Sequence, residues 1–260
     1  MADAYVEALR EAVPGEHLSA IYAKGSAYKP WDSVIDYVPV VSDVDLHVRF
    51  AEDADAERHV GGLRAARALA RRALEHYQTR FPDASHVPRP QLTVLNEIER
   101  QPGYLPSPEG QLHTLYGSPA EGASREAYAS AGTTDAERLA ADARFVREEL
   151  PGKLIDRPGM HAWRDVRMLV WRVGPSGPRV LTQRGMHPHD AWCLNRTAVV
   201  RALEARGAAE LAEAYAAYYL ACWDGYRAGF GDAASAERAL DAVERLFLEA
   251  GTPSGRQPDM

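Results

Sequence analysis

The chain has 260 residues, of which 46% are hydrophobic and 26% are charged, and it carries a formal net charge of −7. These values are typical of a globular protein with one large or two modest domains. They argue against a protein that coats nucleic acid, which needs clustered basic residues, and against a membrane protein, since no apolar run approaches the roughly 20 residues of a spanning helix.

Residues 2–13 form the first predicted helix, which ends at Pro14-Gly15. Because this segment is acidic and amphipathic, we expect no secretory signal. Cys193 and Cys222 are too few and too isolated for a disulfide framework or a zinc site, so we expect a reducing, cytoplasmic environment.

Two predicted strands follow within residues 18–50. The first, AIYAK, leads into a Gly25-Ser26 turn, and the second lies in VPVVSDVDLHV, whose β-branched residues alternate with polar ones. Side chains of a strand alternate between its faces, so Asp43 and Asp45 share one face. Two neighbouring carboxylates repel each other, and a Mg²⁺ ion between them would remove that repulsion. For an isolated Asp-x-Asp pair, a solvated strand end is the simpler alternative.

The order of these features resembles the nucleotidyltransferase superfamily, which has the DNA polymerase β-like fold. The matching residues are Gly25, Ser26, Ser42, Asp43 and Asp45. The resemblance implies that the two aspartates bind Mg²⁺ and that the Gly-Ser turn binds the phosphates of a nucleoside triphosphate such as ATP. It further implies that an acceptor hydroxyl attacks the α-phosphate and pyrophosphate leaves.

The residues around the turn offer further candidates. Lys24 and Lys29 flank it in a chain that has few lysines, so either could contact phosphate, although chance placement explains them equally well. The segment between the turn and the Asp-x-Asp pair is longer than in small members of the superfamily. It carries Trp31, Asp32, Asp36 and Tyr37, which either line a pocket or fix the loop to the core.

A third carboxylate is expected from the superfamily, as a metal ligand or as a general base. A helix over residues 54–80 leads to a third strand over 91–98, where the matching position is Gln91, which cannot accept a proton at neutral pH. Three alternatives remain. The acceptor needs no strong base, Glu97 or Glu99 reaches in from the strand end, or the protein binds nucleotide without turning it over.

The rest of the chain predicts a loop or linker followed by a helical bundle. Gly, Pro and Ser are frequent in residues 101–124, and amphipathic helical patterns follow from about residue 133. We therefore expect an α+β protein with a nucleotidyltransferase domain, a small mixed β-sheet, over residues 1–118 and an α-helical bundle domain over residues 119–260. This layout is similar to that of aminoglycoside adenylyltransferase-like proteins, whose ligands lie between the two domains.

Aromatic, acidic, arginine and histidine side chains of the bundle are candidate ligand contacts. Core packing is the stronger expectation for an aromatic stripe that comprises Tyr215, Tyr218, Tyr219 and Trp223. Asp224 is expected to be an exposed helix charge, and His187 and His189 to lie on a surface loop.

The sequence thus predicts a cytoplasmic, Mg²⁺-dependent nucleotidyltransferase that moves AMP from ATP to a hydroxyl of a small molecule. An acidic protein suits a cationic acceptor, and the antibiotic-resistance enzymes of the superfamily are the nearest precedent. Two alternatives stay open. One is a nucleotide-binding regulatory or catalytically degenerate protein, and the other is an enzyme that nucleotidylates a protein.

Overall fold

The computed structural model describes residues 1–250 of the chain, and the side chains of residues 1–247. It is an α+β structure with one four-stranded sheet and many helices. The chain forms two compact units, the first made of Met1–Lys29 and Ser42–Ala127, and the second of Pro30–Val41 and the chain from Tyr128 onward. The division at residue 118 that the sequence suggests stays a prediction.

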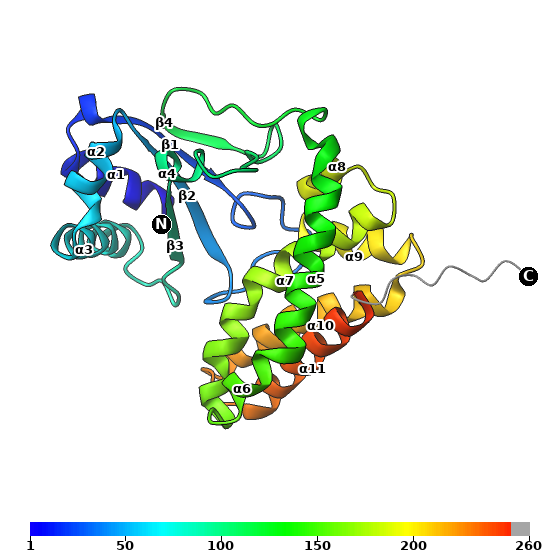
Figure 1. Cartoon of the computed structure of the whole chain (residues 1–260). Coiled ribbons are helices and arrows are strands. Elements are labelled where there is room, and N and C mark those ends of the chain that lie inside the picture. The colour runs from blue at the N-terminus through cyan, green and yellow to red at the C-terminus, as the bar shows by residue number, and fades with distance from the viewer. Residues whose placement is uncertain (251–260) are drawn as a thin grey trace, which may run out of the picture. The chain divides into compact units, whose positions relative to one another are not determined.

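The first unit contains a mixed sheet in the order β3-β2-β1-β4 (Figure 1). Strands β1 and β2 pair antiparallel, as do β1 and β4, whereas β2 and β3 run parallel. Its elements in chain order are α1 (Ala2–Ala12), a 3₁₀ turn η1 (Gly15–His17), β1 (Leu18–Lys24), β2 (Asp43–Phe50), α2 (Asp53–Ala56), a π-helical turn η2 (Glu57–Gly61), α3 (Leu63–Arg80), β3 (Arg89–Val94), α4 (Leu95–Ile98) and β4 (His113–Gly117).

Helices α1 and α3 cover one face of this sheet (Figure 1). The apolar side chains of the strands, such as Ile21 and Val48, pack there against Leu9 and Leu69 of the helices. Because strand side chains alternate, the polar residues of β2 are left on the opposite face. The fold therefore separates an apolar, helix-covered face from a face that carries Asp43 and Asp45.

Four local expectations for the first unit need correction. The strand predicted from residue 38 begins only at Asp43, because Val40 has a positive φ of 68° that no strand residue adopts. The helix predicted over 54–80 is broken by the π-helical turn and by Gly62, whose backbone is extended. The third strand ends at Val94, where α4 begins, and β4 lies within the segment that was expected to be a loop.

The second unit is a helical bundle. Its helices are α5 (Ala131–Glu148), α6 (Leu150–Leu154), α7 (Trp163–Gln183), α8 (Pro188–Cys193), α9 (Arg196–Glu204), α10 (Ala209–Arg227) and α11 (Ala233–Ala250), with 3₁₀ turns η3 (Ala127–Ser130) and η4 (Gly159–Ala162). Helix α7 continues through Pro175 and Pro178, which lie in its interior. At Gly177 of this helix a Cβ would lie 2.5 Å from Val199, so α7 and α9 pack closely where glycine fits best.

The segment between the Gly-Ser turn and the Asp-x-Asp pair belongs to the bundle unit. The side chains of Ile35, Val38 and Val41 are buried in the bundle core. These three apolar residues fix the segment to the core, whereas the role of Trp31 and Tyr37, for which two alternatives were open, stays a prediction. The chain therefore leaves the first unit after Lys29 and returns to it at Ser42.

Candidate functional site

Asp43 and Asp45 lie at the start of β2, next to the end of β1. Asp45 is paired in register with Lys24 of β1 and, on its other side, with Gln91 of β3. Directly paired residues point to the same face of a sheet. The structure therefore places Asp43, Asp45, Lys24 and Gln91 on the polar face, as the alternation in β2 predicts for the two aspartates.

The Gly-Ser turn lies against Asp45. Gly25 has a φ of +81°, and a Cβ built on it would lie 2.0 Å from Oδ2 of Asp45. The backbone N–H groups of Tyr28 and Lys29 donate to the Gly25 carbonyl at 3.1 and 3.2 Å, which closes a tight turn. A glycine is thus required twice over, by the left-handed backbone and by the approach of the carboxylate. The two halves of the sequence motif are adjacent in space.

The remaining residues of the predicted nucleotide site are Ser26, Lys29 and Ser42. Ser26 and Lys29 lie within the Gly-Ser turn or at its end, and Ser42, which is fully buried, directly precedes β2. Ser42 therefore supports the start of the strand and presents no surface to a ligand.

The polar face carries a buried cation and a neutral imidazole. Burial lowers the pKa of Lys24, and the negative charge of Asp45 opposes that shift. Burial, together with the positive charge of Lys24, lowers the pKa of His47 to about 3. His47 is therefore uncharged at neutral pH and is a weak base.

Arg89 is a residue of this face that the sequence did not indicate. It is paired in register with Asp43, and its guanidinium forms an ion pair with Oδ2 of that aspartate. The predicted strand began at residue 91, so Arg89 lay outside it. Had the strand been extended by two residues, the alternation of Arg89, Gln91 and Thr93 would have placed all three on the aspartate face.

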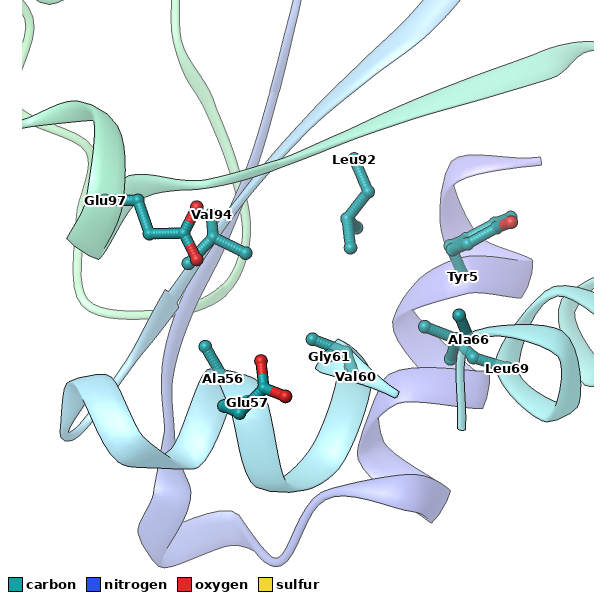
Figure 2. Close-up of a pocket in the computed structure, with 10 residues that line it drawn as sticks. All are labelled: Tyr5, Ala56, Glu57, Val60, Gly61, Ala66, Leu69, Leu92, Val94 and Glu97. Atoms are coloured by element: carbon teal, nitrogen blue, oxygen red, sulfur yellow. The ribbon is translucent and has the colours of Figure 1, made fainter. Parts of the chain in front are cut away.

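Glu97, the predicted third carboxylate, is not brought to this face. It lines a pocket of about 290 Å³ on the helix-covered side of the sheet, together with Leu92 and Val94. Figure 2 shows Glu97 on one wall of this pocket, with Glu57 on the opposite wall. Since Leu92 and Val94 alternate with Gln91 and Thr93, the sheet separates this pocket from the aspartate pair.

Glu99, the other carboxylate considered, forms an ion pair with Arg49, with 2.5 Å between Nη2 and Oε1. Arg49 shares the aspartate face by alternation but lies four residues beyond Asp45. Neither glutamate is therefore a neighbour of the aspartates, and Gln91 occupies the position next to Asp45.

The donor set at this site fits Mg²⁺. Hard divalent cations prefer carboxylate oxygens, which Asp43 and Asp45 supply on one face. An ionised carboxylate has about four lone-pair positions, so Asp43 can accept from Arg89 and still bind a cation. Arg89 lowers the net negative charge available to the ion, and Gln91 adds only a neutral amide.

The bundle unit holds a buried polar cluster around Asp36. The Asp32 and Ser33 N–H groups donate to Oδ2 of Asp36 at 2.8 and 3.0 Å. The Thr197 N–H donates to Oδ1 at 2.9 Å and the Thr197 hydroxyl to Oδ2 at 2.7 Å. Burial raises the pKa of Asp36, but these hydrogen bonds outweigh it and hold the pKa below its usual range. The aromatic pair of the segment, Trp31 and Tyr37, stacks at 5.0 Å between ring centroids.

The other bundle candidates have structural roles. Tyr215, Tyr218 and Tyr219 are buried in the core, as expected. Asp224 is an exposed helix residue that pairs with Arg238 at 3.0 Å. His187 does not lie on a plain loop, because its Nδ1 accepts from the His189 N–H and caps the start of α8.

Among the described residues, none of the helices combines the length and the apolar character needed to span a bilayer. In comparisons with known proteins, the chain matches no family model, and no curated protein or solved structure shows significant similarity to it.

Proposed function

We propose that the chain is a nucleotidyltransferase that binds a nucleoside triphosphate with Mg²⁺ and transfers its nucleoside monophosphate to a hydroxyl group of a small molecule. The observation that carries this proposal is the contact between the Gly25 turn and the Asp45 carboxylate. That contact joins a backbone site for phosphate to a carboxylate site for a cation.

Each residue of the polar face has a role in this proposal. Asp43 and Asp45 would hold Mg²⁺, which would neutralise charge on the triphosphate when bound. The Gly25-Ser26 turn would accept the phosphates, because a backbone free of side-chain bulk allows close approach. Lys24, which lies beside Asp45, would add positive charge for the same phosphates.

The transfer forms a bond between the acceptor oxygen and the α-phosphorus and breaks the bond from that phosphorus to the β-phosphate oxygen. Pyrophosphate leaves, and the hydroxyl proton passes to solvent water. Gln91 cannot take this proton, and His47 is a weak base. The proposal therefore places most of the catalysis in positioning and charge stabilisation, as in phosphoryl transfer generally.

A small cationic acceptor suits this chain. Its formal net charge is −7, and a negative field attracts cations and repels nucleic acid. We therefore infer an acceptor that carries both hydroxyl and ammonium groups, such as an amino sugar.

Pyrophosphate release measured with ATP, Mg²⁺ and a panel of amino sugars tests the proposal. We expect release with at least one acceptor, and its loss in Asp45→Asn. Asp53→Asn is the matched control, because Asp53 is half exposed, pairs with Arg100 and lies outside the polar face. Full activity in the Asp45 variant would show that this carboxylate does not serve the reaction.

The neighbours of the two aspartates favour a second candidate, a nucleotide-binding protein that does not turn its ligand over. Gln91 occupies the position beside Asp45, and Arg89 already pairs with Asp43. This candidate predicts Mg²⁺-dependent nucleotide binding without pyrophosphate release from any acceptor. Release above background with one acceptor would exclude it.

A further inference from the structure

A second group of metal-ligating side chains lies at the other end of the β1–β2 pair. His17 ends η1, Asp55 lies in α2, and His59 lies in the π-helical turn η2. All three belong to the first unit. These residues lie near the end of the pair where Leu18 is opposite Phe50. The candidate nucleotide site lies at the other end, where Lys24 is opposite Asp45.

The three ligand atoms are already close together. Nδ1 of His17 lies 3.1 Å from Oδ1 of Asp55. One ligand atom from each of the three residues lies within 4.8 Å of the others. Ligands of a tetrahedral ion with bonds of about 2.1 Å are separated by roughly 3.4 Å, so ligand atoms that all lie within 4.8 Å of one another are close to the spacing that such an ion requires.

The imidazole of His59 supplies an independent sign of a missing ligand. Its Nε2 is buried and has no hydrogen-bond partner. Buried polar atoms are normally paired, because an unpaired one loses its water without compensation. An ion bound through Nε2 would satisfy this nitrogen, which the 3.1 Å contact between His17 and Asp55 does not do.

The surrounding backbone holds two of the ligands in place. The Ala51 N–H donates to the carbonyl of His17 at 3.0 Å and fixes η1 to the end of β2. Oδ2 of Asp55 accepts from the Glu52 N–H at 3.1 Å, so its carboxylate is oriented by the start of α2. His59 lies in a π-helical turn, a feature that is frequent at functional sites.

We propose that His17, Asp55 and His59 bind one Zn²⁺ ion. Two imidazoles and one carboxylate are a ligand set that zinc accepts in four-coordinate sites with one position left for water. Bound there, the ion would tie η1 to the turn that follows β2. This site is independent of the proposed nucleotide site, which prefers a hard cation on oxygen ligands.

One neighbour opposes the ion. Nη1 of Arg58 lies 3.1 Å from Oδ1 of Asp55, and its positive charge competes for that oxygen. Because the Arg58 side chain is 59% exposed, it can move into solvent at little cost. Its removal should therefore tighten zinc binding, which is the opposite of the effect of removing a ligand.

The test is a calorimetric titration of ZnCl₂ into full-length, tag-free protein that carries Asp43→Asn and Asp45→Asn, so that the proposed nucleotide site cannot bind the ion. We expect one ion per chain. His59→Gln and His17→Gln should each weaken the affinity at least tenfold, whereas Arg58→Ala should raise it. His161→Gln, at an exposed position in the other unit, is the matched control and should have no effect.

A titration with Co²⁺ supplies a readout that does not depend on stability. A tetrahedral site gives the ion intense visible absorption, and this absorption should be lost in His59→Gln. Circular dichroism in EDTA would confirm that the variants are folded. The absence of zinc binding, or binding unchanged in both histidine variants, would overturn the proposal.

Discussion

Replacement of Gly25 by alanine tests the contact at the centre of the candidate site. The new methyl group would lie 2.0 Å from Oδ2 and 3.1 Å from Cγ of Asp45. The carboxylate would have to rotate away, at a cost of about 0.5–1.5 kcal/mol. The left-handed backbone adds about 1–2 kcal/mol. We therefore expect Gly25→Ala to lower the free energy of unfolding by about 2–3 kcal/mol.

Gly110→Ala is the matched control for this variant. Gly110 has a φ of +77°, close to the +81° of Gly25, but no atom lies within 4 Å of the position of its Cβ. It should lose only the backbone contribution, about 1–2 kcal/mol. The difference between the two variants therefore isolates the displacement of Asp45.

The same pair of variants separates stability from ligand binding. At a ligand concentration of about one hundred times Kd, Mg²⁺ and ATP should stabilise the wild type by about 2.7 kcal/mol. If displacement of Asp45 weakens binding about a hundredfold, the gain in Gly25→Ala falls to about 0.4 kcal/mol, while Gly110→Ala keeps the full gain. Chemical denaturation with and without the ligand measures both quantities. Equal ligand-induced stabilisation in the two variants would refute the role of the Gly25–Asp45 contact.

Two further predictions concern the bundle unit. Asp36→Asn should lower the free energy of unfolding by about 2–3 kcal/mol at neutral pH, because the amide cannot accept all the bonds from Thr197 and the neighbouring backbone. The folded pKa of Asp36 is lowered, so its stabilisation is present above the unfolded pKa and is lost as the pH falls through the folded value. The gap between wild type and variant should accordingly shrink below about pH 4 in acid denaturation curves; a gap independent of pH would contradict this. Arg179→Met should cost up to about 3–5 kcal/mol, because it removes the buried guanidinium that Asp135 and Asp142 share. Asp142 would keep its ion pair with Arg172, and Asp135 would keep the hydrogen bonds from Trp192 and Thr182. The exposed control Arg238→Met should cost less than about 1 kcal/mol, and similar losses in both would argue against the buried network.

The sequence predicted the local part of the candidate site and missed the part that depends on tertiary contacts. Alternation alone placed Asp43 and Asp45 on one face, because that property belongs to a single strand. The ion pair of Arg89 with Asp43 could not be predicted without the starting residue of β3. The position of Glu97 likewise depended on the end of that strand, where α4 turns it to the helix-covered side.

Long-range partners explain the remaining differences. Asp36 appeared to be one polar residue of a loop, but its partner Thr197 is 161 residues away in the sequence. The ligand group joins His17 to Asp55 and His59, which lie much later in the chain, and two of its members lie in a 3₁₀ turn and a π-helical turn. Neither turn has a periodic pattern, so neither can be predicted from hydrophobic periodicity.

The central claim is that Asp43, Asp45 and the Gly25 turn bind a nucleoside triphosphate together with a divalent cation. Isothermal titration of ATP into the wild type, with and without Mg²⁺, and into the Asp43→Asn/Asp45→Asn variant tests it most directly. We predict binding only when Mg²⁺ is present, and no binding to the folded variant. Absence of binding at millimolar ATP, or binding that is equal in wild type and variant, would contradict the claim.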